Sequence, residues 1–120
     1  MLRFALLLPA VQPKTPLVMV RYIMSFSVPP GQQEKVLDII DDYFEALQRN
    51  GPAGIRSQCY ATLEDYCHFI HIKSFRKESV AHHHFRSANF REYSKRLEAI
   101  CGHIPSFSRL QQQQTFESIY

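Results

Sequence analysis

The chain has few cysteines and no long apolar stretch, and both absences exclude classes of protein. It has only three cysteines in 120 residues, Cys59, Cys67 and Cys101. Their odd number and the lack of a C-x-x-C spacing argue against a disulfide framework and against a zinc ribbon. We therefore expect a reducing compartment, the cytoplasm. No run of about 18 apolar residues is present, so the sequence predicts no membrane-spanning helix and no membrane partner.

The chain also lacks a strong charge of either sign. Its formal net charge is +3, although residues 73–96 hold seven Lys or Arg against Glu78 and Glu92. Such a local excess would suit an anionic ligand, but a run of this kind more often forms a solvated helical face. No recognised nucleic-acid motif accompanies the basic residues, so we expect no nucleic-acid partner.

Length and apolar content predict one domain. A chain of 120 residues with 45% hydrophobic and 12% aromatic residues can bury one core without cross-links. Residues 1–17 differ from the rest, because Arg3 followed by FALLLPAV resembles a secretory signal. The apolar run is short and Pro9 interrupts it, so we expect residues 1–17 to be an extension of a domain at 18–120. Met19 is then a candidate start site.

The first half of the domain has the periodicity of a strand, a helix and a hairpin. Residues 18–28 alternate between apolar and polar side chains, as a strand does. After Pro-Pro-Gly, apolar residues recur at helical spacing until Gly51, which we expect to take a left-handed helix cap. Residues 54–63 and 66–75 are strand-like and are separated by only two residues, which predicts an antiparallel hairpin.

The second half predicts two helical pieces and a final strand. Residues 77–101 divide into a short helix and a longer one, for which Ser87 is a suitable N-cap. Gly102 ends the longer helix, and residues 106–119 are predicted to form the last strand. The resulting β-α-β-β-α-β order is that of the ferredoxin-like α+β fold with an antiparallel sheet.

In that fold two helices cover one face of the sheet and leave the other bare. Within residues 66–75, alternation places four side chains opposite Ile70 and Ile72: Phe69, His71, Lys73 and Phe75. We expect this aromatic side to be the bare face, where a monomer would expose a large apolar patch. The sequence therefore predicts a homodimer in which two sheets close one barrel.

Two stretches resemble the antibiotic biosynthesis monooxygenase domain family. They are VPPGQQEKVLDIIDDYFEAL and HFRSANFREYSKRL, in which His84 is followed by Ser87 and Phe90 at three-residue intervals. The resemblance covers residues 18–119 and implies a dimeric α/β barrel with the His-x-x-Ser/Thr-x-x-aromatic pattern of quinol monooxygenases. The family often has a tryptophan and a glutamate where this chain has Phe75 and Lys73, and the chain has no tryptophan. That difference argues against haem degradation.

The row His82, His83 and His84 predicts no metal site. On a helix, consecutive side chains project about 100° apart, so the three imidazoles cannot share one ion. Glu78 and His82 form the only i, i+4 pair, and two ligands are too few. We therefore expect no metal, and only His84, which the resemblance selects, keeps a functional assignment.

The resemblance also implies a reaction. Such enzymes oxygenate a small hydroxylated aromatic, quinol- or anthrone-like, with molecular oxygen and no cofactor. The substrate must lose a proton, and its anion must be stabilised. His84 and His71 are the candidate bases, and Lys73 is the candidate group that stabilises the oxyanion. Five aromatic residues are candidates for binding the substrate: Phe69, Phe75, Phe90, Tyr22 and Tyr60.

Two other functions stay open. The barrel could bind a small hydrophobic or anionic molecule without catalysis, which the replaced tryptophan and glutamate favour. It could also be a regulatory module that only dimerises, with His84 a packing residue beside Phe90 and with His71 and Lys73 a polar interface pair. An apolar cavity would favour the oxygenase or the ligand-binding barrel, and a cavity filled by side chains would favour the module that only dimerises.

Overall fold

Seven helices and strands make up the part of the chain that the computed structural model describes, residues 19–118. They follow in the order β2 (Val20–Ser27), α2 (Gln33–Asn50), β3 (Ile55–Ala61), β4 (His68–Phe75), α3 (Glu78–Phe85), α4 (Ala88–Cys101) and β5 (Ser106–Leu110). The predicted β-α-β-β-α-β order is confirmed, with the second helical segment divided into α3 and α4. Within 19–118, no helix is both long and apolar enough to cross a membrane. The predicted extension, residues 1–17, lies outside the described residues.

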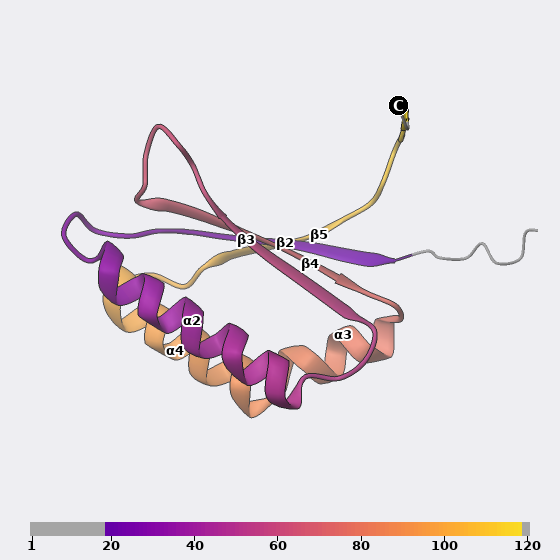
Figure 1. The fold of residues 1–120 in the computed structure, drawn as a ribbon, viewed down its shortest axis with the longest axis horizontal. Helices are drawn as coiled ribbons and strands as arrows, with labels where there is room; N and C mark the ends of the chain where they lie inside the picture. The colour runs from indigo at the N-terminus through magenta and orange to yellow at the C-terminus, as the bar shows by residue number, and fades with distance from the viewer. Residues whose placement is uncertain (1–18, 119–120) are drawn as a thin grey trace, which may run out of the picture.

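The four strands form one antiparallel sheet in the order β3-β4-β2-β5. Helices α2 and α4 run side by side along one face of this sheet, and α3 lies at one end of α4 (Figure 1). This arrangement is the ferredoxin-like fold that the element order predicts. The central strands β2 and β4 pair so that Met24 lies opposite His71 and Phe26 opposite Phe69.

The prediction for the two faces of β4 is wrong. The four side chains expected on the bare face lie beneath the helices, each at most 4% exposed: Phe69, His71, Lys73 and Phe75. Ile70 and Ile72 point to the opposite face, where both are only half-buried. The larger aromatic rings fill the wide space between sheet and helices, whereas the smaller isoleucines remain on the open side.

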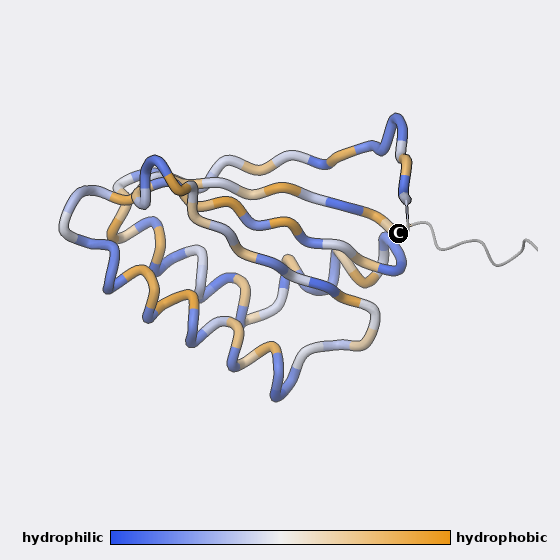
Figure 2. The backbone as a smooth tube through the Cα atoms, turned by 45° about the horizontal axis from the view of Figure 1, so that its top comes forward, coloured by the Kyte–Doolittle hydropathy of each residue, from blue (hydrophilic) through white to orange (hydrophobic). Residues whose placement is uncertain are grey.

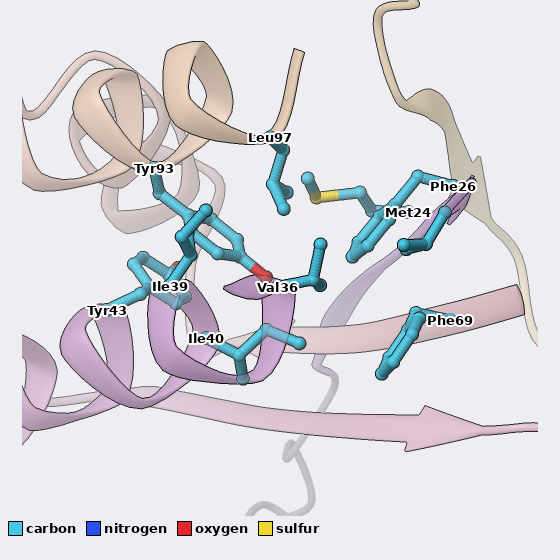
Figure 3. Close-up of a cluster of buried hydrophobic side chains, with 10 residues drawn as sticks. Met24, Phe26, Val36, Ile39, Ile40, Tyr43, Phe69, Tyr93 and Leu97 are labelled. Carbon is cyan, nitrogen blue, oxygen red and sulfur yellow. The ribbon is translucent and has the colours of Figure 1, made fainter. Parts of the chain in front are cut away.

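The hydrophobic core occupies this space between sheet and helices. Along α2 and α4 hydrophobic and hydrophilic residues alternate with each turn, as expected for amphipathic helices (Figure 2). Figure 3 shows the inner faces of the helices converging on the side chains of β2 and β4. The core members from these elements are Met24, Phe26, Val36, Ile39, Ile40, Tyr43, Phe69, Tyr93 and Leu97. Two of these members carry hydroxyl groups that require partners.

The ends of α4 agree with the sequence prediction, whereas the end of α2 does not. Ser87 Oγ accepts a hydrogen bond from the amide of Phe90 at 3.2 Å, and Gly102 has a left-handed φ of 79°. Gly51 has φ −69°, so the predicted left-handed cap is wrong. A Cβ at Gly51 would instead lie 2.3 Å from the carbonyl oxygen of Leu47, and this close approach requires glycine.

The last strand is shorter than predicted. It ends at Leu110, and residues 111–118 are exposed and have no regular structure. The register explains the early end, because Leu110 lies opposite Arg21 and β2 begins only one residue before Arg21, at Val20. Residues after Leu110 therefore run out of backbone partners on β2, and Figure 1 shows the chain turning away from the sheet there.

Candidate functional site

Six polar side chains from five elements lie together beneath the helices. They are Tyr43 on α2, Ser57 on β3, His71 and Lys73 on β4, His84 on α3 and Tyr93 on α4. The register places Ser57 directly opposite Lys73 and on the same face. Apart from Ser57, which is half-buried, each member is at most 2% exposed. We refer to these six residues as the polar cluster.

Lys73, Tyr43 and His84 form one chain of hydrogen bonds. Lys73 Nζ donates to Tyr43 Oη at 2.5 Å and to Ser57 Oγ at 3.2 Å. Tyr43 Oη lies 2.7 Å from His84 Nε2. Tyr43 Oη accepts from Lys73, and its own proton is hydrogen-bonded when it points to His84, so we assign Nε2 of His84 as the unprotonated acceptor. A proton can therefore pass between Lys73 and His84 through one phenol group.

Tyr93 and His71 form a second pair beside this chain. Tyr93 Oη lies 2.5 Å from His71 Nε2, and the opposite nitrogen of His71, Nδ1, is buried without a hydrogen-bond partner in the described part of the chain. If Nε2 donated, both the Tyr93 proton and the Nδ1 lone pair would lack partners. If Tyr93 donates, only the Nδ1–H of His71 lacks a partner. We therefore assign Tyr93 as the donor. The rings of Tyr43 and Tyr93 stack in parallel, 4.1 Å apart.

The polar cluster contains no carboxylate. The ion pairs found in residues 19–118 join His82 and Arg109 to Glu78 and Arg96 to Asp42, and none includes Lys73. Burial lowers the pKa of Lys73 to about 7. Burial, reinforced by the positive charge of Lys73, lowers the pKa of both His71 and His84 to about 3. At neutral pH the two histidines are uncharged, and Lys73 loses its proton far more readily than an exposed lysine does.

Burial acts on the two phenols in the opposite direction. It raises the pKa of Tyr43 and of Tyr93 above the ordinary value of 10, because the phenolate is the charged form. Both groups therefore hold their protons at neutral pH and act as hydrogen-bond donors to the histidines. The polar cluster is a set of neutral donors and acceptors in which only Lys73 titrates near pH 7.

Two hollows in the surface differ in their distance from the polar cluster. A groove of about 180 Å³ between α2 and α4 reaches Tyr43 and Tyr93, and Asp42 and Arg96 line its rim. A second, open hollow of about 1010 Å³ lies elsewhere, at the edge formed by β2, β5 and residues 111–112. Of these two hollows in the described part of the chain, the smaller one touches members of the polar cluster.

Comparison with known proteins identifies the family. The family model described as antibiotic biosynthesis monooxygenase matches residues 19–96, which is more than half of the chain. The chain belongs to the antibiotic biosynthesis monooxygenase family. The resemblance found in the two sequence stretches is therefore confirmed. No curated protein matches the chain.

Solved structures support the fold of the family. A conserved protein from Methanosarcina mazei Go1 shares 15% identity over 81% of this chain and 95% of its own, with a TM-score of 0.71. An antibiotic biosynthesis monooxygenase shares 15% identity over 79% of this chain and 99% of its own, with a TM-score of 0.69. A protein from Mycobacterium tuberculosis shares 13% identity over 82% of this chain and 99% of its own, with a TM-score of 0.69. Identities this low establish a shared fold and not a shared substrate.

The structure brings most of the predicted site residues of this family member together. His71, Lys73 and His84 belong to the polar cluster, and the rings of Phe75 and Phe90 lie 5.5 Å and 5.3 Å from the His84 ring. These two aromatic residues therefore flank the imidazole that the family pattern selects.

Three other predicted residues lie further from His84. Phe69 stacks on Phe26 at 5.5 Å, under the other end of the helices. Tyr22 donates a hydrogen bond to Glu78 at 3.1 Å and so ties β2 to α3. Tyr60 is 51% exposed and points to the bare face with Ile70, so it does not share the site.

Sequence reasoning did not select Tyr43, Tyr93 or Ser57. The two tyrosines occupy apolar helix stripes, and that pattern alone predicts core residues. A usable signal was present, because a phenol in a buried stripe requires a hydrogen-bond partner, and His71 and Lys73 are the polar groups on β4 that can supply one.

The other histidines of the row lie apart from the polar cluster. His82 and His83 are exposed on α3, and the His82 imidazole lies 3.7 Å from a carboxylate oxygen of Glu78. No group of three or more His, Cys, Asp or Glu residues within 19–118 is arranged to hold a metal ion. Helical geometry thus separates His84 from its two neighbours.

Proposed function

We propose that the protein is a cofactor-independent monooxygenase that acts on a small hydroxylated aromatic compound, quinol- or anthrone-like. The observation that carries this proposal is the Lys73–Tyr43–His84 chain, a buried set of neutral groups that can take up a proton. Family membership supports the reaction type. Phe75 and Phe90 supply aromatic surface beside this chain.

The reaction needs a base and a group that stabilises an anion. The substrate hydroxyl gives its proton to the polar cluster, where His84, His71 and Lys73 are the candidate acceptors. Lys73, with a pKa of about 7, is the strongest of these bases, and its ammonium form then lies beside the oxyanion that it created. The electron-rich anion reacts with molecular oxygen. One oxygen atom becomes bonded to a ring carbon, the substrate is oxidised to a quinone, and the other oxygen atom leaves as water with the two hydrogens that the substrate loses.

Oxygen uptake with a panel of hydroquinones and anthrones tests this proposal. The wild type should consume oxygen faster than the enzyme-free solution with at least one compound. His84→Gln, His71→Gln and Lys73→Met remove the proton acceptors, and loss of the base should lower the rate by about 10² to 10⁴. The control is His83→Gln, because His83 is the exposed neighbour of His84. Uptake equal to the enzyme-free rate across the panel would refute the oxygenase function.

We also propose that a second copy of the chain covers the bare face of the sheet. This face carries five apolar side chains that are partly exposed: Ile23, Tyr60, Ile70, Ile72 and Leu110. Two such sheets packed together would bury these side chains in a joint barrel. Size-exclusion chromatography with light scattering should give twice the chain mass, and Ile70→Lys should shift it to one chain mass. A monomeric wild type would contradict this proposal.

A second candidate function is a dimeric module without catalysis. It is favoured by the groove of about 180 Å³, which is smaller than the ~300 Å³ at which ordinary ligand sites begin. Titration calorimetry with the same panel separates the two candidates, since a module that only dimerises gives no heat of binding. For either function we propose a cytoplasmic location, which the three unpaired cysteines favour.

A further inference from the structure

Two buried tyrosines in this chain are arranged in a way that suits electron transfer as well as proton transfer. Tyr43 and Tyr93 stack in parallel at 4.1 Å, and each donates its phenolic proton to a neutral imidazole. The other tyrosines of residues 19–118 lack this combination, since Tyr60 and Tyr66 are 51% and 62% exposed and Tyr22 donates to the carboxylate of Glu78 rather than to an imidazole. The chain has no tryptophan, so tyrosine is its most readily oxidised aromatic residue.

One-electron oxidation of a phenol depends on where the proton goes. The phenol radical cation is a far stronger acid than the phenol, and a positive charge in a buried site is costly. An acceptor within hydrogen-bond distance lessens this difficulty, because the proton leaves as the electron leaves, a neutral radical remains, and the positive charge passes to the more basic acceptor. His71 Nε2, 2.5 Å from Tyr93 Oη, is such an acceptor.

Tyr93 is the better electron donor of the two. The oxygen of Tyr43 already accepts a hydrogen bond from Lys73, which withdraws electron density and disfavours oxidation. Tyr93 Oη has no such donor among the hydrogen bonds of the described residues. The parallel Tyr43 ring can share the unpaired electron and stabilise the oxidised state.

We propose that Tyr93 is a redox-active tyrosine that transfers one electron to an oxygen-centred radical of the peroxyl class. The O–H bond of Tyr93 breaks, an N–H bond forms at His71 Nε2, and Tyr93 becomes a neutral tyrosyl radical. The electron reduces the peroxyl radical to a hydroperoxide anion, which takes a proton from water. This site does not depend on the proposed monooxygenase activity.

The surroundings of His71 make the oxidised state short-lived. Once Nε2 has taken the phenolic proton, the imidazolium carries an Nδ1–H without a partner in the described structure. Burial also opposes this charge, as the low pKa of His71 shows. The proton therefore returns to Tyr93 as soon as a reductant, such as a thiol or a hydroquinone, restores the electron. The site is suited to intercepting radicals repeatedly rather than to storing one.

Flash oxidation with photogenerated ruthenium(III) tris-bipyridine tests the proposal on the full chain. Freeze-quenched samples should show a tyrosyl radical by electron paramagnetic resonance, and ring-deuterated tyrosine should narrow its signal. Tyr60→Phe and Tyr66→Phe remove two exposed tyrosines, Tyr22→Phe removes the tyrosine that donates to Glu78, and all three variants should leave this signal in place. Tyr93→Phe should abolish it, with far-ultraviolet circular dichroism confirming that the variant is folded.

The histidine variants give an independent test. Removal of a positioned proton acceptor typically lowers a rate by about 10² or more, so His71→Gln should slow the appearance of the radical about 100-fold. His83→Gln, a change at an exposed histidine, should not. The proposal is overturned if the signal disappears with Tyr60→Phe and Tyr66→Phe. It is also overturned if the signal disappears with Tyr43→Phe but remains with Tyr93→Phe. Equal rates in the wild type and His71→Gln would also overturn it.

Discussion

Replacing Lys73 by methionine should stabilise the protein at pH 7 and remove a pH dependence that the wild type has. Lys73 is fully buried, and no carboxylate within the described residues pairs with it. In the unfolded chain the amine keeps its proton up to its ordinary pKa of 10.5, whereas in the folded protein that pKa is about 7. Between these values the unfolded state binds more protons, so wild-type stability rises with pH.

The magnitude follows from the two pKa values. At about 1.4 kcal/mol per pH unit, the span from 10.5 to about 7 corresponds to about 5 kcal/mol, of which about 4 kcal/mol opposes folding at pH 7. Methionine removes this penalty but loses the bonds to Tyr43 and Ser57, worth about 1 kcal/mol each. The net gain at pH 7 should be about 2 kcal/mol, and by pH 9 it should approach zero.

Urea unfolding followed by circular dichroism measures this difference at both pH values, at one fixed protein concentration. Titrations common to both proteins cancel when the variant is compared with the wild type. Lys95→Met is the matched control, because Lys95 is exposed on α4 and its replacement should change stability by less than about 0.5 kcal/mol. If the difference between wild type and Lys73→Met were the same at pH 7 and pH 9, the buried neutral amine would be refuted.

Three further predictions concern caps and titrating groups. Ser87→Ala removes the cap of α4 and should lower the free energy of unfolding by about 1 kcal/mol in urea titrations, unless Phe90 N–H finds another acceptor. Gly51→Ala should lower the melting temperature, because its Cβ would lie 2.3 Å from a carbonyl oxygen; an unchanged value would show that the helix end relaxes freely. His71 and His84 have pKa values of about 3 in the folded protein and 6.5 in the unfolded chain. The unfolded chain therefore binds more protons between these values, and stability should fall as pH drops from 6.5 towards 3. His71→Gln should weaken this acid sensitivity in circular dichroism, and an equal loss in both proteins would exclude His71 as its source.

The elements of the fold could be predicted from sequence because each has a local signal. Alternation, helical spacing and turn residues placed the strands and helices, and the N-cap at Ser87 was correct. The length of β5 could not be found this way, since it depends on where β2 begins, which is a property of the sheet. Gly51 shows the same limit, because its requirement for glycine comes from the approach of another backbone atom.

The candidate site could be predicted only in part, and one error explains the rest. Alternation divides β4 into two sets but does not say which set faces the helices. With Ile70 and Ile72 assigned to the core, His71 and Lys73 were separated from the helix face that carries Tyr43. The hydroxyl partners of this network were therefore not visible from any single segment. The pairing of a helix stripe with a strand face is a tertiary property, which local pattern does not determine.

The polar cluster lowers the stability of the core that contains it. Burial lowers the pKa of Lys73, and Nδ1 of His71 has no hydrogen-bond partner within residues 19–118, so apolar residues of similar volume should pack there at lower cost. Groups that destabilise a core in this way are typical of functional sites. A double variant, His71→Phe with Lys73→Met, should be more stable than the wild type in urea at pH 7 but should lose oxygen uptake and the Tyr93 radical. If it gained stability and kept both activities, the polar cluster would have no function; if it lost stability, the cluster would be structural.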